Sequence, residues 1–324
     1  MITLVPLLVP RSAQALPLGP GPAVITFDMQ KAVTTAALFD RDGIMRGLSR
    51  GPSPLLDGET SVGEAAMLQV EDRTTQFARD FPEVTPTAIG LIGPGVVDDA
   101  EGIAILSADL RWANVPYKRL AERRLKLPSS FSSDARAAGE AEFQLGAARP
   151  YNNVVVLRLG ERIASTLYVD GRMHGGGGFA GGLGHTIVDP NGRRCACGSH
   201  GCLQTVASTG AIVDCYAELS AEANVTIDEV FARARRGDQT ASLVWATALD
   251  AVTLVISQIA AVLAPEAVVI SGGLAATGDE FFLPLRHRVN ALLSFHRRPA
   301  LLPSMFDGNA ALVGAALRAR AIAA

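Results

Sequence analysis

The segment His185-Thr-Ile-Val-Asp-Pro-Asn-Gly-Arg-Arg-Cys195-Ala-Cys197-Gly-Ser-His-Gly-Cys202 carries more structural information than any other part of this chain. It places one imidazole and three thiols, those of His185, Cys195, Cys197 and Cys202, within eighteen residues. Four such ligands fill a tetrahedral zinc shell and leave no coordination position for water. We therefore expect a structural zinc ion that holds a loop together, and no hydrolytic role for it.

Other residues in and near this segment fit the same interpretation. Gly192, Gly198 and Gly201 would supply the positive φ angles that a chain needs when it folds tightly around one ion. His200 is a fifth donor, which we expect to be a solvated turn residue. Cys215 lies outside the cluster in an apolar helical run, so we expect it to be a small buried hydrophobic residue.

The composition is that of a cytoplasmic protein with a large core. The chain has 324 residues, of which 48% are hydrophobic, and its formal net charge is -3. The length predicts two domains, and the charge argues against a nucleic-acid-binding surface. An apolar stretch without charge or proline that is long enough to span a membrane is not found in the sequence. No basic residue precedes the short apolar segment at the N-terminus, so we expect no signal peptide.

Strand and helix signals alternate from residue 23 onward, which predicts an α/β fold. The expected strands are 23–28, 36–40, 87–92, 153–159, 165–169 and 267–270. The expected helices are 61–81, 120–125, a helix from 135, 208–219 and 241–263. The first helix has a capping box at Ser61 and Glu64, and residues 93–98 are expected to form a tight turn.

Several motifs share the order and approximate spacing of the ROK family (repressors, open reading frames, kinases), which this chain resembles after Ala23. They are Asp28 with Asp40-x-x-Gly43, Gly93-Pro-Gly-Val-Val-Asp98, Leu110-x-Trp112, Asp134-Ala, Asp170-Gly171-x-x-x-Gly175, Gly272-Gly273, and Gly184-His185 with Cys195-x-Cys197-Gly198-x-x-Gly201-Cys202-Leu203. The resemblance implies the actin-like, ribonuclease-H-like sugar-kinase fold, with ATP and a hexose bound between two α/β lobes. It also implies a structural zinc loop and a homodimer.

The resemblance predicts the domain organisation as well. We expect an irregular N-terminal arm at 1–22 and an N-terminal lobe at 23–146, with a C-terminal helix at about 307–324 packing back on it. The C-terminal lobe, 147–306, would carry the zinc loop. The repressor branch of the family has a helix-turn-helix module before the first strand, and 22 residues are too few for one. We therefore expect no direct binding to nucleic acid.

The phosphate-binding loops depart from the family pattern. Family kinases have Asp-x-Gly-Gly-Thr where this chain has Asp28-Met29-Gln30-Lys31-Ala32, and Gly-Thr-Gly where it has Gly160-Glu161-Arg162. Small residues there let the backbone approach phosphate groups, so binding of ATP and Mg²⁺ is placed in doubt. Lys31 and Arg162 would either pair with Asp28 and Glu161 or bind an anionic ligand. The cofactor-binding candidates that the resemblance implies are Asp28, Gln30, Lys31, Gly160, Arg162, Gly272 and Gly273.

The sugar-binding positions are altered too. The family's Asn-Asp pair is Ser133-Asp134 here, the Glu of its Glu-x-Gly-His motif is Gly182, and its Glu after Cys-Leu is Gln204. Loss of two carboxylates would weaken hexose binding, since charge-assisted hydrogen bonds contribute about 1.5–3 kcal/mol each. Asp134 is either the base that accepts the proton of the sugar hydroxyl or part of a helix N-cap. His185 could bind zinc with one nitrogen and contact the sugar with the other.

Three functions are compatible with these residues. The favoured one is a pseudokinase that binds a sugar-like or anionic small molecule or acts as a regulator, because phosphoryl transfer depends almost entirely on positioning and on charges around the phosphates. The alternative is an active ATP-dependent kinase of a sugar, cyclitol or related polyol, with Asp134 as general base. A second alternative is a different chemistry recruited to the same cleft.

Overall fold

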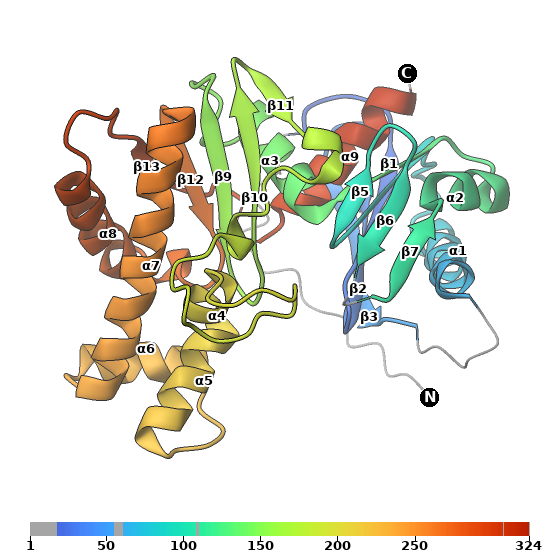
Figure 1. Ribbon diagram of the computed structural model, residues 1–324. Coiled ribbons are helices and arrows are strands. Elements are labelled where there is room, and N and C mark those ends of the chain that lie inside the picture. Colours follow the sequence, from blue (N-terminus) through green and yellow to red (C-terminus); the bar gives the residue numbers. More distant parts are fainter. Residues whose placement is uncertain (1–17, 55–60, 108–109, 307, 324) are drawn as a thin grey trace. The chain divides into compact units, whose positions relative to one another are not determined.

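The computed structural model describes residues 18–54, 61–107, 110–306 and 308–323, and these form two compact units. One unit comprises Met1–Asp134 and Leu312–Ala324, and the other comprises Ala135–Ala311 (Figure 1). Most of the expected N-terminal arm, residues 1–17, lies outside the described residues. Each unit is an α/β structure with its own sheet and its own apolar core.

The first unit contains a five-stranded sheet of order β3-β2-β1-β4-β8. Its strands are β1 (Val24–Met29), β2 (Val33–Phe39), β3 (Met45–Pro52), β4 (Ala88–Gly93) and β8 (Ser129–Ser133). β2 is antiparallel to both of its neighbours, β1 and β3, whereas β4 runs parallel to both β1 and β8. Asp28 pairs with Ile92 and Gly93 pairs with Ser133, so β1, β4 and β8 end at the same edge of the sheet.

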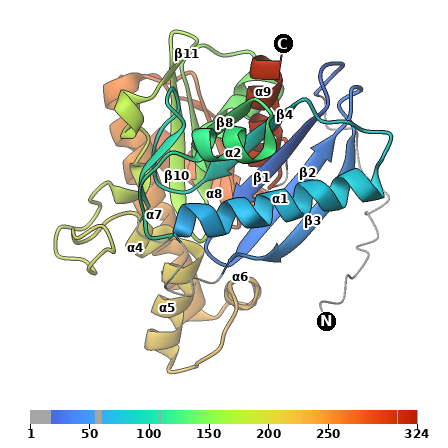
Figure 2. The same ribbon diagram turned by 90° about the vertical axis from the view of Figure 1, so that its right-hand side faces the viewer.

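Helices cover this sheet. They are α1 (Val62–Asp80), α2 (Tyr117–Leu125) and α9 (Ala310–Ala323), and Figure 2 shows α1 lying across β1, β2 and β3. α1 begins where the capping box predicts, because the Ser61 hydroxyl accepts a hydrogen bond from the Glu64 N–H at 3.3 Å. α9 packs directly on β4, since a Cβ atom at Gly90 would lie 2.3 Å from the Ala315 carbonyl oxygen.

A small antiparallel sheet follows β4 in the sequence. It consists of β5 (Val96–Asp98), β6 (Ile103–Ser107) and β7 (Trp112–Val115). The prediction of a turn over residues 93–98 was therefore wrong for its second half. The sequence motif contains the turn at Gly95, where φ is +114°, but the pairing of β5 with β6 depends on residues farther along the chain.

The second unit repeats the strand pattern of the first. Its sheet has the order β11-β10-β9-β12-β13, with two antiparallel pairs followed by two parallel pairs. The strands are β9 (Val154–Leu159), β10 (Ile163–Val169), β11 (Arg172–His174), β12 (Ala267–Ser271) and β13 (Ala300–Pro303). A repeated sheet of this kind in each unit agrees with the actin-like fold expected from the sequence.

The helices of the second unit surround its core. They are α3 (Asp134–Gln144), α4 (Gln204–Ala207), α5 (Thr209–Ser220), α6 (Ile227–Arg235), α7 (Gln239–Leu263) and α8 (Asp279–Leu292), with 3₁₀ turns η1 (Gly176–Gly178), η2 (Leu183–His185) and η3 (Ala275–Thr277). Among the described residues, α7 is long and apolar enough to cross a membrane, but half of its most apolar window is buried in this unit. Length and composition are weak evidence for a membrane span, and its buried side chains belong to the core.

Candidate functional site

The four predicted zinc ligands lie together in the second unit. Their ligand atoms are all within 4.8 Å of one another. The Cys195 Sγ lies 3.6 Å from the His185 Nδ1, and the Cys197 Sγ lies 3.7 Å from the Cys202 Sγ. Zinc bonds of about 2.3 Å to sulfur and about 2.0–2.1 Å to nitrogen give tetrahedral edges of about 3.8 Å and 3.5 Å. The donor set therefore fits one tetrahedral zinc ion.

Two glycines shape this loop by their backbone angles, as predicted. Gly198 has a φ of +97° and Gly201 a φ of +65°. A Cβ atom at Gly201 would lie 1.4 Å from the Asp189 carbonyl oxygen, so this position accepts only glycine. The same prediction was wrong for Gly192, which has no positive φ; there a Cβ atom would lie 2.9 Å from the Gly201 Cα. Gly192 is required by close approach of two backbone segments.

Main-chain hydrogen bonds also hold this loop, and they do not involve the side chains of the four candidate ligands. The Cys195 N–H donates to the Ser199 carbonyl at 2.8 Å, and the Gly201 N–H donates to the Arg193 carbonyl at 2.8 Å. Burial raises the pKa of the Cys202 thiol to about 12, whereas a backbone hydrogen bond at Ser199 lowers the pKa of Cys197. Zinc binds the deprotonated thiols, so metal binding would release protons from this cluster.

The two remaining donors lie apart from this cluster. His200 is exposed, as expected, and is not part of the group of four ligands, but it lies in an isolated antiparallel bridge with Arg194 and not in a turn. Cys215 on α5 is only half-buried, although its side chain packs against the core of the second unit. Cys215 therefore lies in an apolar helix, as expected, but its side chain is less buried than expected.

A second group of predicted residues lies at the carboxyl edge of the first sheet. Asp28 is near the end of β1, and Asp134 follows β8 and is the first residue of α3. The side-chain nitrogen of Gln30 donates to the Asp28 Oδ1 at 2.6 Å and to the Asp134 Oδ2 at 3.1 Å. Asp134 is 7% exposed. One amide therefore connects two carboxylates at this edge.

The turn that carries Gln30 is fixed by its own hydrogen bonds. The Gln30 N–H donates to the Val33 carbonyl at 3.2 Å. The Ser53 hydroxyl donates to the Gln30 carbonyl at 2.6 Å, and the Ser53 N–H donates to the Ala32 carbonyl at 3.0 Å. Lys31, in the same turn, is exposed. Ser53 was not predicted, because a serine that follows a strand carries no distinguishing signal in the sequence.

Three of the remaining phosphate-loop candidates, Gly160, Gly272 and Gly273, lie close together in the second unit. The Thr209 N–H, at the start of α5, donates to the Gly160 carbonyl at 3.0 Å. Gly272 has a φ of +97°, and a Cβ atom there would lie 2.3 Å from the Leu159 carbonyl oxygen. A Cβ atom at Gly273 would lie 3.0 Å from the Thr209 side chain. The glycine pair thus packs against the end of β9 and the N-terminus of α5.

Gln204, expected to contact the substrate, has its side chain bound to the β9–β10 turn. Its Oε1 accepts a hydrogen bond from the Ile163 N–H at 2.7 Å, and its Nε2 donates to the Glu161 carbonyl at 2.8 Å. The other predicted residues of this region, Gly182 and His185, are joined by a hydrogen bond from the His185 N–H to the Gly182 carbonyl at 2.9 Å. Sequence analysis missed the role of Gln204 because both partners are main-chain groups.

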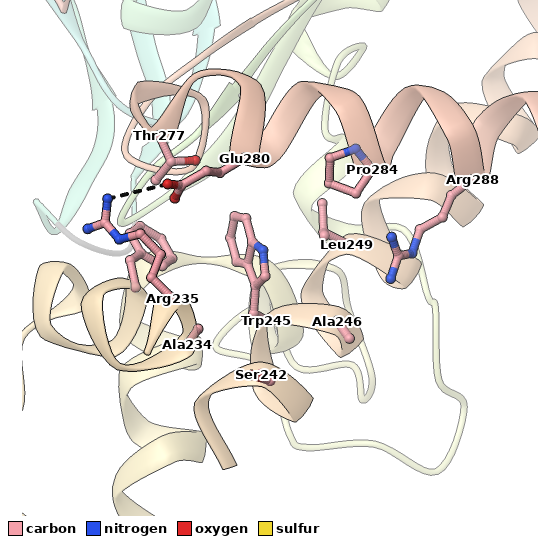
Figure 3. Close-up of a pocket in the computed structure, with 11 residues that line it drawn as sticks. Ala234, Arg235, Ser242, Trp245, Ala246, Leu249, Thr277, Glu280, Pro284 and Arg288 are labelled. Atoms are coloured by element: carbon pink, nitrogen blue, oxygen red, sulfur yellow. Dashed lines mark hydrogen bonds and ion pairs between the residues drawn. The ribbon is translucent and has the colours of Figure 1, made fainter. Parts of the chain in front are cut away.

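A separate pocket of about 460 Å³ lies between α6, α7 and α8 (Figure 3). The indole of Trp245 points into it, and Arg235 and Glu280 form an ion pair at 3.5 Å on one side. The residues that line it are Phe231, Ala234, Arg235, Ser242, Trp245, Ala246, Leu249, Thr277, Glu280, Pro284 and Arg288. Sequence analysis did not predict this pocket, because α6 and α8 were not recognised from the pattern.

Comparisons with known proteins identify the family of this chain. The model of the ROK family matches residues 25–322. The chain is 31% identical over 216 residues to a glucokinase from Thermotoga maritima, covering 62% of this chain and 68% of the relative. The crystal structure of a ROK hexokinase from Thermus thermophilus is 26% identical with a TM-score of 0.77, covering 92% of this chain and 97% of that one.

A further solved structure belongs to a ROK transcriptional regulator described as a homologue of the Escherichia coli Mlc protein. It is 25% identical with a TM-score of 0.82, and the match covers 94% of this chain and 79% of the regulator. Kinases and regulators therefore both share this architecture. With the family match over nearly the whole length, the resemblance seen in the sequence is confirmed: the chain belongs to the ROK family and has the fold of its sugar kinases.

Proposed function

We propose that this protein is an ATP-dependent sugar kinase that transfers the γ-phosphoryl group to a hydroxyl of a hexose or related polyol. The relatives named glucokinase and hexokinase support this activity. Sequence analysis favoured a pseudokinase and doubted ATP and Mg²⁺, but these relatives support the kinase alternative better. The zinc ion that the Cys3His group can hold would be structural, because all four tetrahedral positions are occupied by side chains.

The observation that supports a kinase most directly is the carboxylate pair Asp28 and Asp134. Both lie at the carboxyl edge of a sheet with parallel strands, where ligands bind in open α/β folds. Asp134 would accept the proton of the attacking hydroxyl, a step that requires a carboxylate held within hydrogen-bond distance of its substrate. Asp28 would provide a carboxylate for the metal ion that accompanies the nucleotide. Gln30 joins the two carboxylates through one oxygen of each.

Gln30 places a side chain in the phosphate turn at a position where the family has glycine. This side chain is hydrogen-bonded to other residues of its own unit. The Gln30 amide is directed to Asp28 and Asp134 within its own unit. The substitution therefore places a hydrogen-bond donor beside the proposed base, which is compatible with catalysis. Phosphoryl transfer depends on positioning and electrostatic stabilisation. A donor that is fixed beside the proposed base could contribute to both.

The test is a coupled assay with ATP, Mg²⁺ and a panel of hexoses and cyclitols. We expect turnover of at least one sugar, and a loss of about 10²–10⁴-fold in kcat for Asp134→Asn. Asp214→Asn, on the exposed face of α5, is the control and should keep full activity. Equal turnover by Asp134→Asn and the unmodified protein would exclude Asp134 as the base.

A second candidate is a regulatory protein that binds a sugar-like or anionic small molecule without phosphorylating it. The similarity to the ROK transcriptional regulator favours it. This candidate predicts that a sugar raises the melting temperature while ATP does not, because a ligand stabilises only the state that binds it. Thermal-shift measurements with each ligand alone, and with both, separate the two functions.

A further inference from the structure

The Gln204 side chain connects the metal-binding segment to the turn between β9 and β10. Its carboxamide accepts one hydrogen bond, from the Ile163 N–H at 2.7 Å, and donates another, to the Glu161 carbonyl at 2.8 Å. One partner is a donor and the other an acceptor, so the site matches an amide. A carboxylate here would retain the bond to Ile163 but would face the Glu161 carbonyl oxygen without a proton to share.

The backbone that carries Gln204 is tied to the zinc segment. Gln204 is the first residue of α4 and lies two positions after Cys202, one of the four zinc ligands. The Thr205 N–H and hydroxyl both donate to the Cys202 carbonyl at 2.8 Å. The Leu203 N–H donates to the Thr186 carbonyl at 2.8 Å, on the other side of the segment. Movement of the Cys202 backbone would therefore move Gln204 with it.

A second contact joins the same two regions. Gly184, which precedes the zinc ligand His185, packs against the first residue of β10. A Cβ atom at Gly184 would lie 2.3 Å from the Ile163 carbonyl oxygen and 3.1 Å from the Ile163 Cβ. Ile163, directly after the β9–β10 turn, is thus held by residues that lie within two positions of His185 and Cys202, the first and the last of the candidate ligands.

We propose that Gln204 is a positioning residue that holds the β9–β10 turn, residues 160–162, in one conformation and makes its order depend on the zinc ion. Metal binding fixes the backbone around Cys202, and Gln204 transmits that restraint to Ile163 and Glu161. The part of the inference that concerns phosphate rests on the proposed function, because Gly160 and Arg162 would face a nucleotide only in a kinase. The link between metal and turn does not depend on it.

Hydrogen exchange of the zinc-loaded full chain tests the link without an activity measurement. Gln204→Met keeps the side-chain length and removes both hydrogen bonds, so the Ile163 amide should exchange about tenfold faster or more. Zinc content and the exchange of α7 amides should stay as in the unmodified protein. Gln144→Met is the matched control, since the Gln144 amide donates to the Glu140 carboxylate on the surface of α3. Unchanged exchange at Ile163 in Gln204→Met would overturn the proposal.

Removal of zinc by a chelator is the second arm. We expect faster exchange across residues 160–163 in the unmodified protein and little further increase in Gln204→Met. Protection at Ile163 that survives metal removal, in a chain that remains folded, would also overturn the proposal. If Gln204→Met fails to fold, Gln204→Glu provides a second test, because it retains the acceptor for Ile163 but loses the donor to the Glu161 carbonyl. Residues 160–162 should then exchange faster while the Ile163 amide stays protected, and unchanged exchange over 160–162 would overturn the proposal.

Calorimetry with ATP adds the functional arm. We expect Gln204→Met to bind ATP about five- to tenfold more weakly than the unmodified protein, and Gln144→Met to bind it equally well. If the unmodified protein binds no ATP, the proposed kinase function fails. The exchange measurements still decide whether Gln204 links the metal site to the turn.

Discussion

The sulfur atoms of Cys197 and Cys202 lie 3.7 Å apart, which is far beyond the length of a disulfide bond and close to the edge of a zinc tetrahedron. Cys202 is fully buried and Cys197 is exposed, so Cys202 would anchor a zinc ion to the core while Cys197 would close the site from solvent. The site therefore lies at the point where the exposed segment around Cys197 joins the buried segment around Cys202.

Cys197→Ser should lower the zinc content and the stability together. A structural zinc ion contributes folding free energy directly, so we expect a loss of at least about 2 kcal/mol in the free energy of unfolding. Elemental analysis and urea denaturation measure the two quantities. Cys215→Ser is the control, because Cys215 lies outside the ligand group and should retain the metal. A fully folded unmodified protein without zinc would contradict the assignment.

The clustering of the four candidate zinc ligands and most of the two central sheets could be predicted from the sequence, because both depend on local patterns. Ligand spacing identified the four side chains that the structure brings together, and buried apolar runs identified β1, β4, β9 and β12. These signals lie within short stretches of chain and need no knowledge of distant residues. The edge strands β3 and β13 have few buried residues and were not predicted.

The roles of individual side chains were harder to predict. Gln30 was expected near phosphate and Gln204 near a sugar, but the structure gives each amide partners in its own unit. The Gln30 contact with Asp134 spans 104 positions, and the partners of Gln204 lie about 41 positions away. Such pairs form only when the sheet has been assembled, so spacing in the sequence does not reveal them.

Gln30→Met should reduce phosphoryl transfer if the protein is a kinase. The change keeps the side-chain length but removes the donor that bonds to Asp28 and Asp134. A hydrogen bond to a charged group contributes about 1.5–3 kcal/mol, so kcat should fall by about ten- to a hundredfold, with little change in the KM for the sugar. Steady-state kinetics measure both constants.

Gln69→Met is the matched control for this variant. The Gln69 amide donates to the Pro52 carbonyl on the surface of the first unit, so its loss should leave kcat within about twofold. A rise in kcat on replacement of Gln30 would show that the amide obstructs the carboxylates instead of positioning them.

Arg320→Met should destabilise the first unit. The Arg320 guanidinium on α9 is 8% exposed and donates to four main-chain carbonyls, those of Leu18, Gly19, Pro22 and Asp40. Its removal leaves buried acceptors without a donor, which costs about 1–3 kcal/mol for each group that water does not reach. We expect a loss of about 2–4 kcal/mol in the free energy of unfolding, measured by urea denaturation. Arg79→Met on the exposed end of α1 should change it by less than about 0.5 kcal/mol.

Asp40 should make the stability of the protein depend on pH in the acidic range. Burial alone raises the pKa of Asp40, but hydrogen bonds from the Ile44 N–H, the Arg46 guanidinium and the Asp42 N–H outweigh burial and bring the pKa below its ordinary value. A carboxylate with a lowered pKa in the folded state stabilises the protein above the unfolded pKa of about 3.9, and this contribution disappears as the pH falls through the folded pKa.

The free energy of unfolding should therefore decline below about pH 4, and Asp40→Asn should weaken that decline because asparagine does not titrate. Urea denaturation at a series of pH values between about 2.5 and 6 measures the slope for each protein. Asp42→Asn is the control, since its side chain is exposed on the same turn and its backbone bond to Asp40 is retained. If Asp40→Asn is less stable than the unmodified protein by the same amount at every pH, the contribution of Asp40 comes from hydrogen-bond geometry and not from its charge.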